Sequence, residues 1–304
     1  MSKGVHRFAL LVAGATFFLI IAGANVTSHD AGLATTDWPL SNGQVFPKMV
    51  GNLFWEHGHR LVASTVGLLT IALAIYLQVR ERRSWVKRLG WIALGGVIAQ
   101  GLLGGLTVKM NLPLAVSAAH ATLAQLFFLT TVSLAAFTSR SWQAPGVSIN
   151  EAGQGISLRS LGVIALVVIL GQLVLGATLR HSATWDQPLP TGLLLAHVGG
   201  AAIVTLVLGG TILRVLLKYR TEKFLTKPAL TAAGLLFIQL LLGLAAYVAR
   251  AASPNDPQPL NPMISITVAH VACGALLLAT TALLTLRAFR VLRVERQEYV
   301  LAPA

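Results

Sequence analysis

The sequence predicts an all-α integral membrane protein whose eight transmembrane helices form two pseudo-symmetric four-helix bundles. Of its 304 residues, 55% are hydrophobic and only 11% are charged, and the mean hydropathy is +0.72. Soluble domains carry about 25% charged residues. The composition therefore excludes an ordinary cytosolic enzyme, a disordered chain and a nucleic-acid-binding domain.

Eight apolar segments are long enough to cross a bilayer, which takes about 20 residues of helix. The first resembles a cleavable signal peptide, because Lys3 and Arg7 precede it. Its apolar run is longer than a typical signal core and seven further spans follow, so we expect it to be retained. The predicted spans are 8–27, 54–79, 89–108, 114–138, 159–179, 192–217, 229–249 and 263–286.

Basic residues predict the orientation. Lys and Arg number 23 against 10 Asp and Glu, which gives a net charge of +13. If the N-terminus is cytoplasmic, 18 of the 23 basic residues fall on the cytoplasmic side, where membrane proteins concentrate them. We therefore expect a multi-pass protein of the cell (inner) membrane with both termini cytoplasmic. The five basic residues left on the outer side are Lys48, Arg60, Lys109, Arg180 and Arg250.

A short motif suggests an internal duplication. Glutamine followed four residues later by glycine recurs near the outer end of the third, fifth and seventh spans, as Gln100–Gly104, Gln172–Gly176 and Gln239–Gly243. A repeat of parallel sense fits four helices per half. We expect an N-terminal half at residues 1–140 and a C-terminal half at 141–304. The first span lacks the glutamine, and chance similarity among apolar helices is the alternative.

Four histidines are the most informative residues. Each lies about two turns inside the outer end of an even-numbered span, and ionisable residues inside a membrane are costly and typically functional. A lone helical histidine is usually a satisfied hydrogen-bonding residue, but four at one depth favour metal ligation. Haem needs only two axial ligands, from facing helices. The histidines are His59 and His120 in the first half, and His197 and His270 in the second.

Other metal sites have fewer ligands to draw on. A closed zinc site lacks carboxylates or thiolates beside each histidine pair. The single cysteine, Cys273, excludes an intrachain disulfide and a multi-cysteine cluster. The sequence therefore predicts one haem pocket per half, with iron held by the histidine pairs.

The two predicted pockets differ in their neighbours. Glu56, His59 and Arg60 share one helical face in the first half. When the halves are aligned on their histidines, Leu194 and Val198 replace the acid and the base. This asymmetry predicts a reactive site in the first half and an electron-transfer haem in the second. The alternative is an ion pair that only stabilises the helix end.

The chain resembles the haem A synthase family. The resemblance rests on the motif EHGHR at Glu56–Arg60, the outer-loop sequence GLATTDWPLS at Gly32–Ser41, the four histidines and the duplicated layout, and it covers nearly the whole chain. It implies oxidation of the C8 methyl of haem O to a formyl group, by successive hydroxylations and loss of water. The product would be haem A for terminal oxidase assembly.

The resemblance also implies roles for individual residues. The first half would hold the substrate haem O through His59 and His120, with Glu56 essential to the chemistry. His197 and His270 would bind a haem b cofactor. Haem O synthase and a membrane electron acceptor are expected partners, and nucleic acid is not.

One feature departs from the family. Many bacterial members carry a cysteine pair in the first outer loop, at positions that match Thr35 and Ser41 here. A mechanism that requires a loop thiol or disulfide therefore cannot operate in this chain, which resembles the cysteine-free members.

Several outer residues have two readings. Arg60 would keep Glu56 ionised or bind a haem propionate. Trp38 would cap a pocket mouth or belong to an interfacial belt. Three basic residues would contact haem propionates or serve as interfacial anchors: Lys109, Arg180 and Arg250. We expect three outer histidines to be solvent-exposed: His29, His57 and His181.

Two other functions compete with the enzyme. A bis-histidine di-haem cytochrome for electron transfer only would also hold two haems, but it needs neither Glu56 nor Arg60. A transporter should show polar residues and broken helices near the membrane centre. The central turns here are almost entirely Leu, Ala, Val, Ile and Gly, which argues against transport.

Overall fold

The computed structural model describes residues 3–144, 149–151, 155–182, 189–252 and 261–294, almost all of them helical. Eight of the helices in these ranges are long and apolar enough to cross a membrane, which confirms the predicted multi-pass architecture. The first four are α1 Lys3–Ser28, α2 Asn52–Arg80, α3 Ser84–Lys109 and α4 Leu114–Thr138. The other four are α6 Leu158–Ser182, α7 Thr191–Lys218, α8 Lys223–Ala252 and α9 Asn261–Val291.

The helices run further than the apolar segments that predict them. Hydropathy marks only the part that suits lipid, whereas the helix continues into the polar region at each end. Helix α2, for example, runs on to Arg80, and the extended residues Glu81 and Arg83 then lead into α3. Helix α4 starts directly after Pro113, whose missing N–H is no loss at a helix start.

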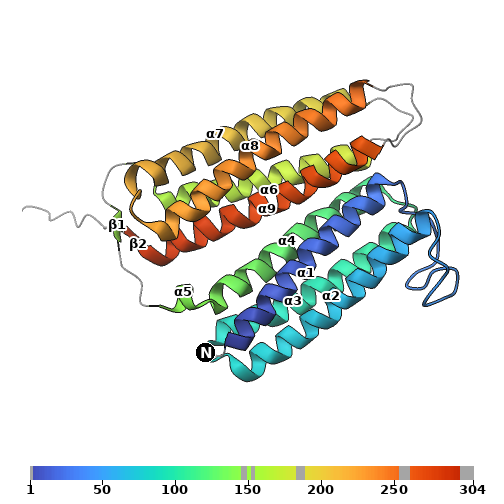
Figure 1. The fold of residues 1–304 in the computed structure, drawn as a ribbon, viewed down its shortest axis with the longest axis horizontal. Coiled ribbons are helices and arrows are strands. Elements are labelled where there is room, and N and C mark those ends of the chain that lie inside the picture. The colour runs from blue at the N-terminus through green and yellow to red at the C-terminus, as the bar shows by residue number, and fades with distance from the viewer. Residues whose placement is uncertain (1–2, 145–148, 152–154, 183–188, 253–260, 295–304) are drawn as a thin grey trace, which may run out of the picture.

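The helices pack as two four-helix groups that lie side by side (Figure 1). In the first group α1 contacts α2 and α4, and α3 contacts α2 and α4. In the second group α6 and α8 each contact α7 and α9 in the same way. This shared set of neighbours agrees with the predicted pair of bundles.

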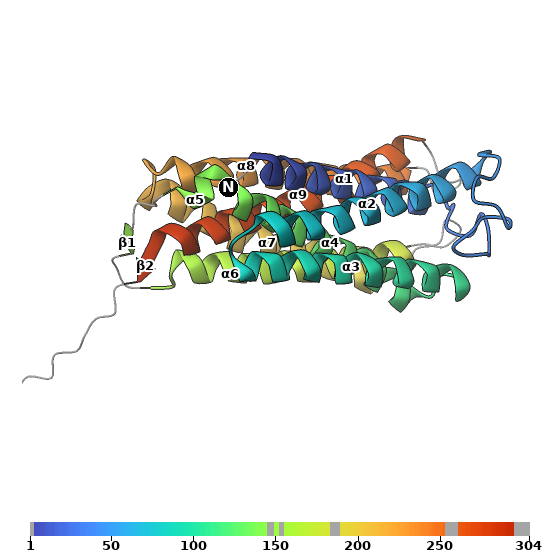
Figure 2. The same ribbon diagram turned by 90° about the horizontal axis from the view of Figure 1, so that it is seen from below.

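A seam of apolar side chains joins the two groups. Helices α1 and α4 of the first group contact α9, and α4 also contacts α6. Ile20 and Phe128 pack there against Ala275 and Ala279, with small side chains on one side and large ones on the other. Figure 2 shows the long helices of both groups running nearly parallel to one another.

Three short elements lie outside the predicted spans. Helix α5, Arg140–Gln143, follows α4 directly. Strand β1, Ile149–Glu151, pairs in parallel with β2, Leu292–Val294, which continues α9. These elements lie at the end of the molecule that carries the N-terminus, and the long α1–α2 loop lies at the opposite end (Figure 1).

Candidate functional site

The α1–α2 loop folds against the first turns of α2, where it meets Glu56. This carboxylate is only 4% exposed. Arg60, one turn further along α2, forms an ion pair with Oε1. The backbone N–H of Thr35 in the loop donates to Oε2 with a distance of 3.0 Å. Both carboxylate oxygens are therefore held, and the acid is fixed in a buried position.

Arg60 ties the loop to the same helix. Its Nη1 donates to the carbonyl of Asp37 at 3.0 Å and to the carbonyl of Leu40. It also donates to the hydroxyl of Ser41 at 3.1 Å. One guanidinium thus bridges Glu56 and the loop segment 37–41.

Ser41 extends this network to His57. Ser41 is fully buried, and a hydrogen bond of 2.8 Å joins its Oγ to His57 Nδ1. His57 is only 3% exposed. The expectation that His57 is solvent-exposed is therefore wrong, because the loop folds over it. His29 is half-buried and stacks on Trp55 with ring centroids 3.9 Å apart.

Asp37 organises the loop itself. Its carboxylate accepts the backbone N–H of Gly43 at 2.8 Å and of Asn42 at 2.9 Å, and the hydroxyl of Thr35. The hydrogen bonds from Gly43 and Thr35 hold the pKa of Asp37 well below its usual range. The loop that covers Glu56 therefore carries a fixed negative charge of its own.

Trp38 packs into the bundle. A Cβ on Gly105 of α3 would lie 2.6 Å from the indole ring, so only glycine admits Trp38 at this place. Lys109 at the end of α3 donates to the carbonyl of Thr36 at 3.4 Å. The loop is thus fixed to α3 as well as to α2, as a cap over the first helix group requires.

Each of the four histidines lies against a glycine on the preceding long helix. A Cβ built on that glycine would come within 2.9–3.1 Å of the imidazole Cε1 in all four cases. The absence of a side chain there lets the imidazole lie between two closely packed helices. The pairs are Gly23 with His59, Gly104 with His120, Gly176 with His197, and Gly243 with His270.

Three of the histidines also contact the glutamine of the repeated motif. Gln100 Nε2 donates to the carbonyl of His120 at 3.0 Å, and Gln172 Nε2 donates to the carbonyl of His197 at 2.8 Å. Gln239 Nε2 lies 3.3 Å from His270 Nε2. In the repeated motif, the glutamine and the glycine therefore both contact the same histidine on the next helix.

The second histidine pair has the spacing of two ligands on one iron. The ring centroids of His197 and His270 lie 6.3 Å apart. Metal–nitrogen bonds of about 2.0–2.1 Å on both sides of one metal put the centroids roughly 6 Å apart. Nδ1 of His270 is buried and makes no hydrogen bond with the described residues. These residues fit a bis-histidine haem.

The first histidine pair consists of His59 in α2 and His120 in α4. The Nδ1 atoms of both rings are buried and have no hydrogen-bond partner among the described residues. In those residues, no three His, Cys, Asp or Glu side chains converge on one point. Two imidazoles are the protein ligands that a haem iron requires.

Other predicted outer residues lie between the helix groups. Arg180, near the end of α6, donates to the carbonyl of Thr27 in α1 at 2.8 Å, which links the two groups. His181 is half-buried rather than fully exposed.

Cys273 is buried in α9, and its thiol donates to the carbonyl of Leu235 at 3.4 Å.

Sequence reasoning used Gly104, Gly176 and Gly243 only as marks of the repeat and missed their contacts with the histidines, and it missed Gly23. It also missed the direct links of Thr35 and Ser41 to Glu56, Arg60 and His57. The signal for these loop contacts was the loop sequence itself, in which the hydroxyl residues Thr35 and Ser41 stand among turn residues.

Comparisons with known proteins point to one family. The family model described as COX15-CtaA, cytochrome oxidase assembly protein, matches residues 6–187. The match includes Glu56, His59 and His120 and ends before His197.

Curated relatives agree with the family model. A heme A synthase of Symbiobacterium thermophilum is 32% identical over 68% of this chain and 74% of its own length. One of Bacillus licheniformis is 27% identical over 60% of this chain and 61% of its own. One of Shouchella clausii is 29% identical over 81% of this chain and 86% of its own.

Proposed function

Since the chain belongs to the COX15-CtaA family of cytochrome oxidase assembly proteins, we propose that it is a haem A synthase. It oxidises the C8 methyl of haem O to a formyl group and so supplies haem A for terminal oxidase assembly. It is a membrane oxidoreductase that acts on a methyl group of its substrate.

The observation that carries this proposal is the environment of Glu56. The carboxylate is buried, ion-paired to Arg60 and bonded by the Thr35 N–H. It lies on the same face of α2 as His59, one turn away. A haem ligand with a fixed carboxylate beside it suits oxidation of a group on the haem edge.

The first half, residues 1–140, is assigned to the substrate. His59 and His120 hold the iron of haem O, and each imidazole lies over a helix glycine. His59 is the one of the four whose partner helix has Leu19 in place of the motif glutamine. A substrate must be exchanged after each turnover, and a less constrained ligand suits that need.

The second half, residues 141–304, is assigned to the cofactor. His197 and His270 have the ring separation that one iron between them requires. A haem b bound there supplies one-electron redox chemistry. Leu194 and Val198, which replace Glu56 and Arg60, leave no ionisable side chain at these two places.

Glu56 acts as the proton acceptor. Oxidation of a methyl group removes protons together with electrons, and a positioned carboxylate can take the proton. The positive charge of Arg60 favours the ionised form of this carboxylate. Ser41 bonds both Arg60 and His57, and so connects this pair to a second titratable group.

The orientation and the partners are part of the same proposal. Both termini lie in the cytoplasm and the haem sites lie towards the outer face of the cell membrane, as the positive-inside rule indicates. Haem O synthase supplies the substrate, and a membrane electron acceptor removes the electrons.

A bis-histidine cytochrome for electron transfer only is not favoured. It requires two haem sites but no buried carboxylate, and it gives no role to the contacts among Thr35, Glu56 and Arg60.

The test is co-expression with a source of haem O, followed by purification and analysis of the extracted haems. We expect haem A or its hydroxylated precursor in the wild-type protein. Haem b alone, in the wild type and in Glu56→Ala alike, would support the electron carrier instead.

A further inference from the structure

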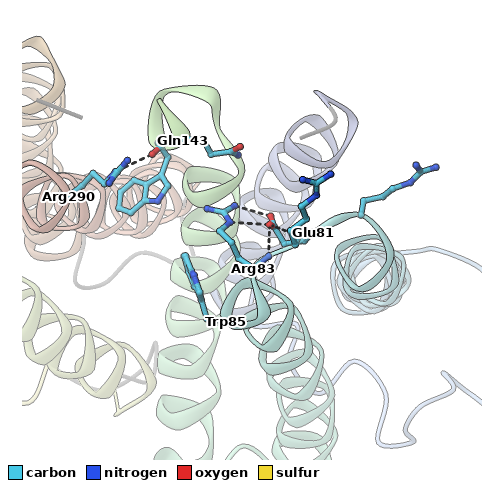
Figure 3. Close-up of a pocket in the computed structure, with 8 residues that line it drawn as sticks. Glu81, Arg83, Trp85, Gln143 and Arg290 are labelled. Carbon is cyan, nitrogen blue, oxygen red and sulfur yellow. Dashed lines mark hydrogen bonds and ion pairs between the residues drawn. The ribbon is translucent and has the colours of Figure 1, made fainter. Parts of the chain in front are cut away.

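A basic cavity lies at the end of the molecule opposite to Glu56. It has a volume of about 740 Å³ and is bordered by the α2–α3 connection, by α5 and by the end of α9. Figure 3 shows Arg290 entering from one side and Arg83 from the other. The lining residues are Arg80, Glu81, Arg82, Arg83, Trp85, Trp142, Gln143 and Arg290.

Arg83 is held firmly in the wall of this cavity. Its Nη2 donates to Oε2 of Glu81 at 2.9 Å and to the carbonyl of Phe137 at 2.9 Å. The guanidinium carbon lies 5.4 Å from the ring centroid of Trp85. Because its position is fixed before any ligand arrives, little side-chain entropy is lost on binding.

Arg290 is held from the opposite side. Its Nε donates to the carbonyl of Trp142 at 3.2 Å and its Nη2 to that of Ala144 at 3.1 Å. Carbonyl groups fix a guanidinium without neutralising its charge. Arg80 and Arg82 add two exposed guanidiniums. The lining of the cavity thus holds four arginines and one acid, Glu81.

The rings of Trp85 and Trp142 form the apolar part of the wall, and both pack against the buried ring of Phe137. The rings of Trp85 and Phe137 lie 4.8 Å apart, and those of Phe137 and Trp142 lie 4.9 Å apart, both edge to face. Trp85 is 44% exposed beside the first turn of α3. Tryptophan at a helix end is typical of the membrane interface, where a lipid has its glycerol region.

We propose that this cavity binds the phosphate group of an anionic phospholipid, with arginines around the phosphate and the rings of Trp85 and Trp142 against the glycerol region. Basic pockets between transmembrane helices suit such headgroups. The arginines come from α9 of the second helix group and from the α2–α3 connection of the first. A bound headgroup therefore ties the two groups together at this end.

The test uses the full chain in detergent and native mass spectrometry, titrated with phosphatidylglycerol, phosphatidylcholine or inorganic phosphate. We expect one saturable phosphatidylglycerol site, with much weaker binding of the other two. Arg290→Gln and the exposed-site variant Arg82→Gln should each weaken binding about fivefold. Arg220→Gln, which removes an exposed arginine outside the cavity, is the matched control.

Three results would overturn the proposal. If Arg220→Gln weakens binding as much as Arg290→Gln, the attraction is general surface charge. If phosphatidylcholine binds equally well, the arginines have no role. If inorganic phosphate binds as tightly as the lipid, the ligand is a soluble phosphate compound and the lipid assignment is wrong.

Discussion

The backbone N–H of Thr35 donates to Glu56 Oε2 at 3.0 Å, although the two residues lie 21 positions apart in the chain. The donor is a main-chain group, so it does not depend on the residue type at position 35. Thr35 therefore serves Glu56 as well as a cysteine would at the same place. The loop can hold the acid without the cysteine pair of many relatives.

Glu56→Gln should remove activity and leave the fold intact. The amide has the same shape as the acid but cannot accept a proton, and general-base catalysis contributes about a hundredfold or more. Extracted haem should shift from haem A to haem O, while the absorption of the second haem is unchanged. Glu222→Gln at the start of α8 is the control, and undiminished haem A in Glu56→Gln would contradict the assigned role.

His197→Ala and His270→Ala should each abolish the b-type haem spectrum. An iron with one remaining axial imidazole is held more weakly and changes its spin state. His59→Ala and His120→Ala should keep that spectrum and lose only bound haem O. Reduced-minus-oxidised difference spectra of the purified variants decide between these outcomes. The opposite pattern would mean that the two halves exchange their assigned roles.

Gly176→Ala should weaken haem binding in the second half. The new methyl group would lie 2.9 Å from His197 Cε1, and overpacking of this kind costs about 1–3 kcal/mol. Haem retention during purification and the thermal unfolding temperature both report the effect. Gly171→Ala is the matched control in the same helix, because nothing lies within 4 Å of its Cβ. Equal losses in the two variants would exclude a specific role for the glycine.

Gln172→Leu copies the residue that α1 has at the equivalent place. It removes the 2.8 Å hydrogen bond to the carbonyl of His197 and the 3.1 Å contact with His197 Nδ1, and the imidazole becomes freer to turn. Loss of a residue that orients a metal ligand typically costs 10–100-fold in metal affinity. We expect about a tenfold weaker haem affinity and a shifted midpoint potential in a redox titration. An unchanged potential would show that the glutamine only fills space.

Glu81 should make stability depend on pH on the acid side. Burial raises the pKa of this carboxyl, but hydrogen bonds and the charge of Arg83 outweigh it and lower the pKa below its usual value. A lowered pKa means that the stabilisation is complete above the unfolded value, about 4.3. It is lost as the pH falls through the lower folded value.

Thermal unfolding in detergent between pH 6 and pH 3 measures this effect. Glu81→Gln should be less stable than the wild type at pH 6, and the difference should shrink below about pH 4.3. A difference that stays constant over the whole range would rule out the ion pair as its source.

The sequence predicts the eight helices well because lipid selects strongly for long apolar segments. It also predicts the four histidines at one depth, because each lies about two turns inside the outer end of its span. The contact of the helix glycines with the histidines was not predictable, because contact between two helices depends on their rotation and crossing angle. Hydropathy does not report either.

The outer loop shows the same limit. His57 was expected at the surface because a histidine at a helix end usually meets water. Its burial depends on Ser41, which reaches it only when the loop turns back over α2. Such long-range folding of a loop leaves no periodic signal in the sequence. Helix α5 and the β1–β2 pair leave none either, because they are too short to show a period.

The glycine–histidine contact occurs once in every hairpin formed by two consecutive long helices. The chain holds four such hairpins, α1–α2, α3–α4, α6–α7 and α8–α9, each with its glycine before its histidine. Each predicted haem pocket then lies between two hairpins, with one histidine from each. Only the first hairpin has exchanged the glutamine for Leu19 and placed Glu56 and Arg60 beside its histidine. Three hairpins therefore hold their histidine with a glutamine, and the first instead carries an ion pair beside its histidine.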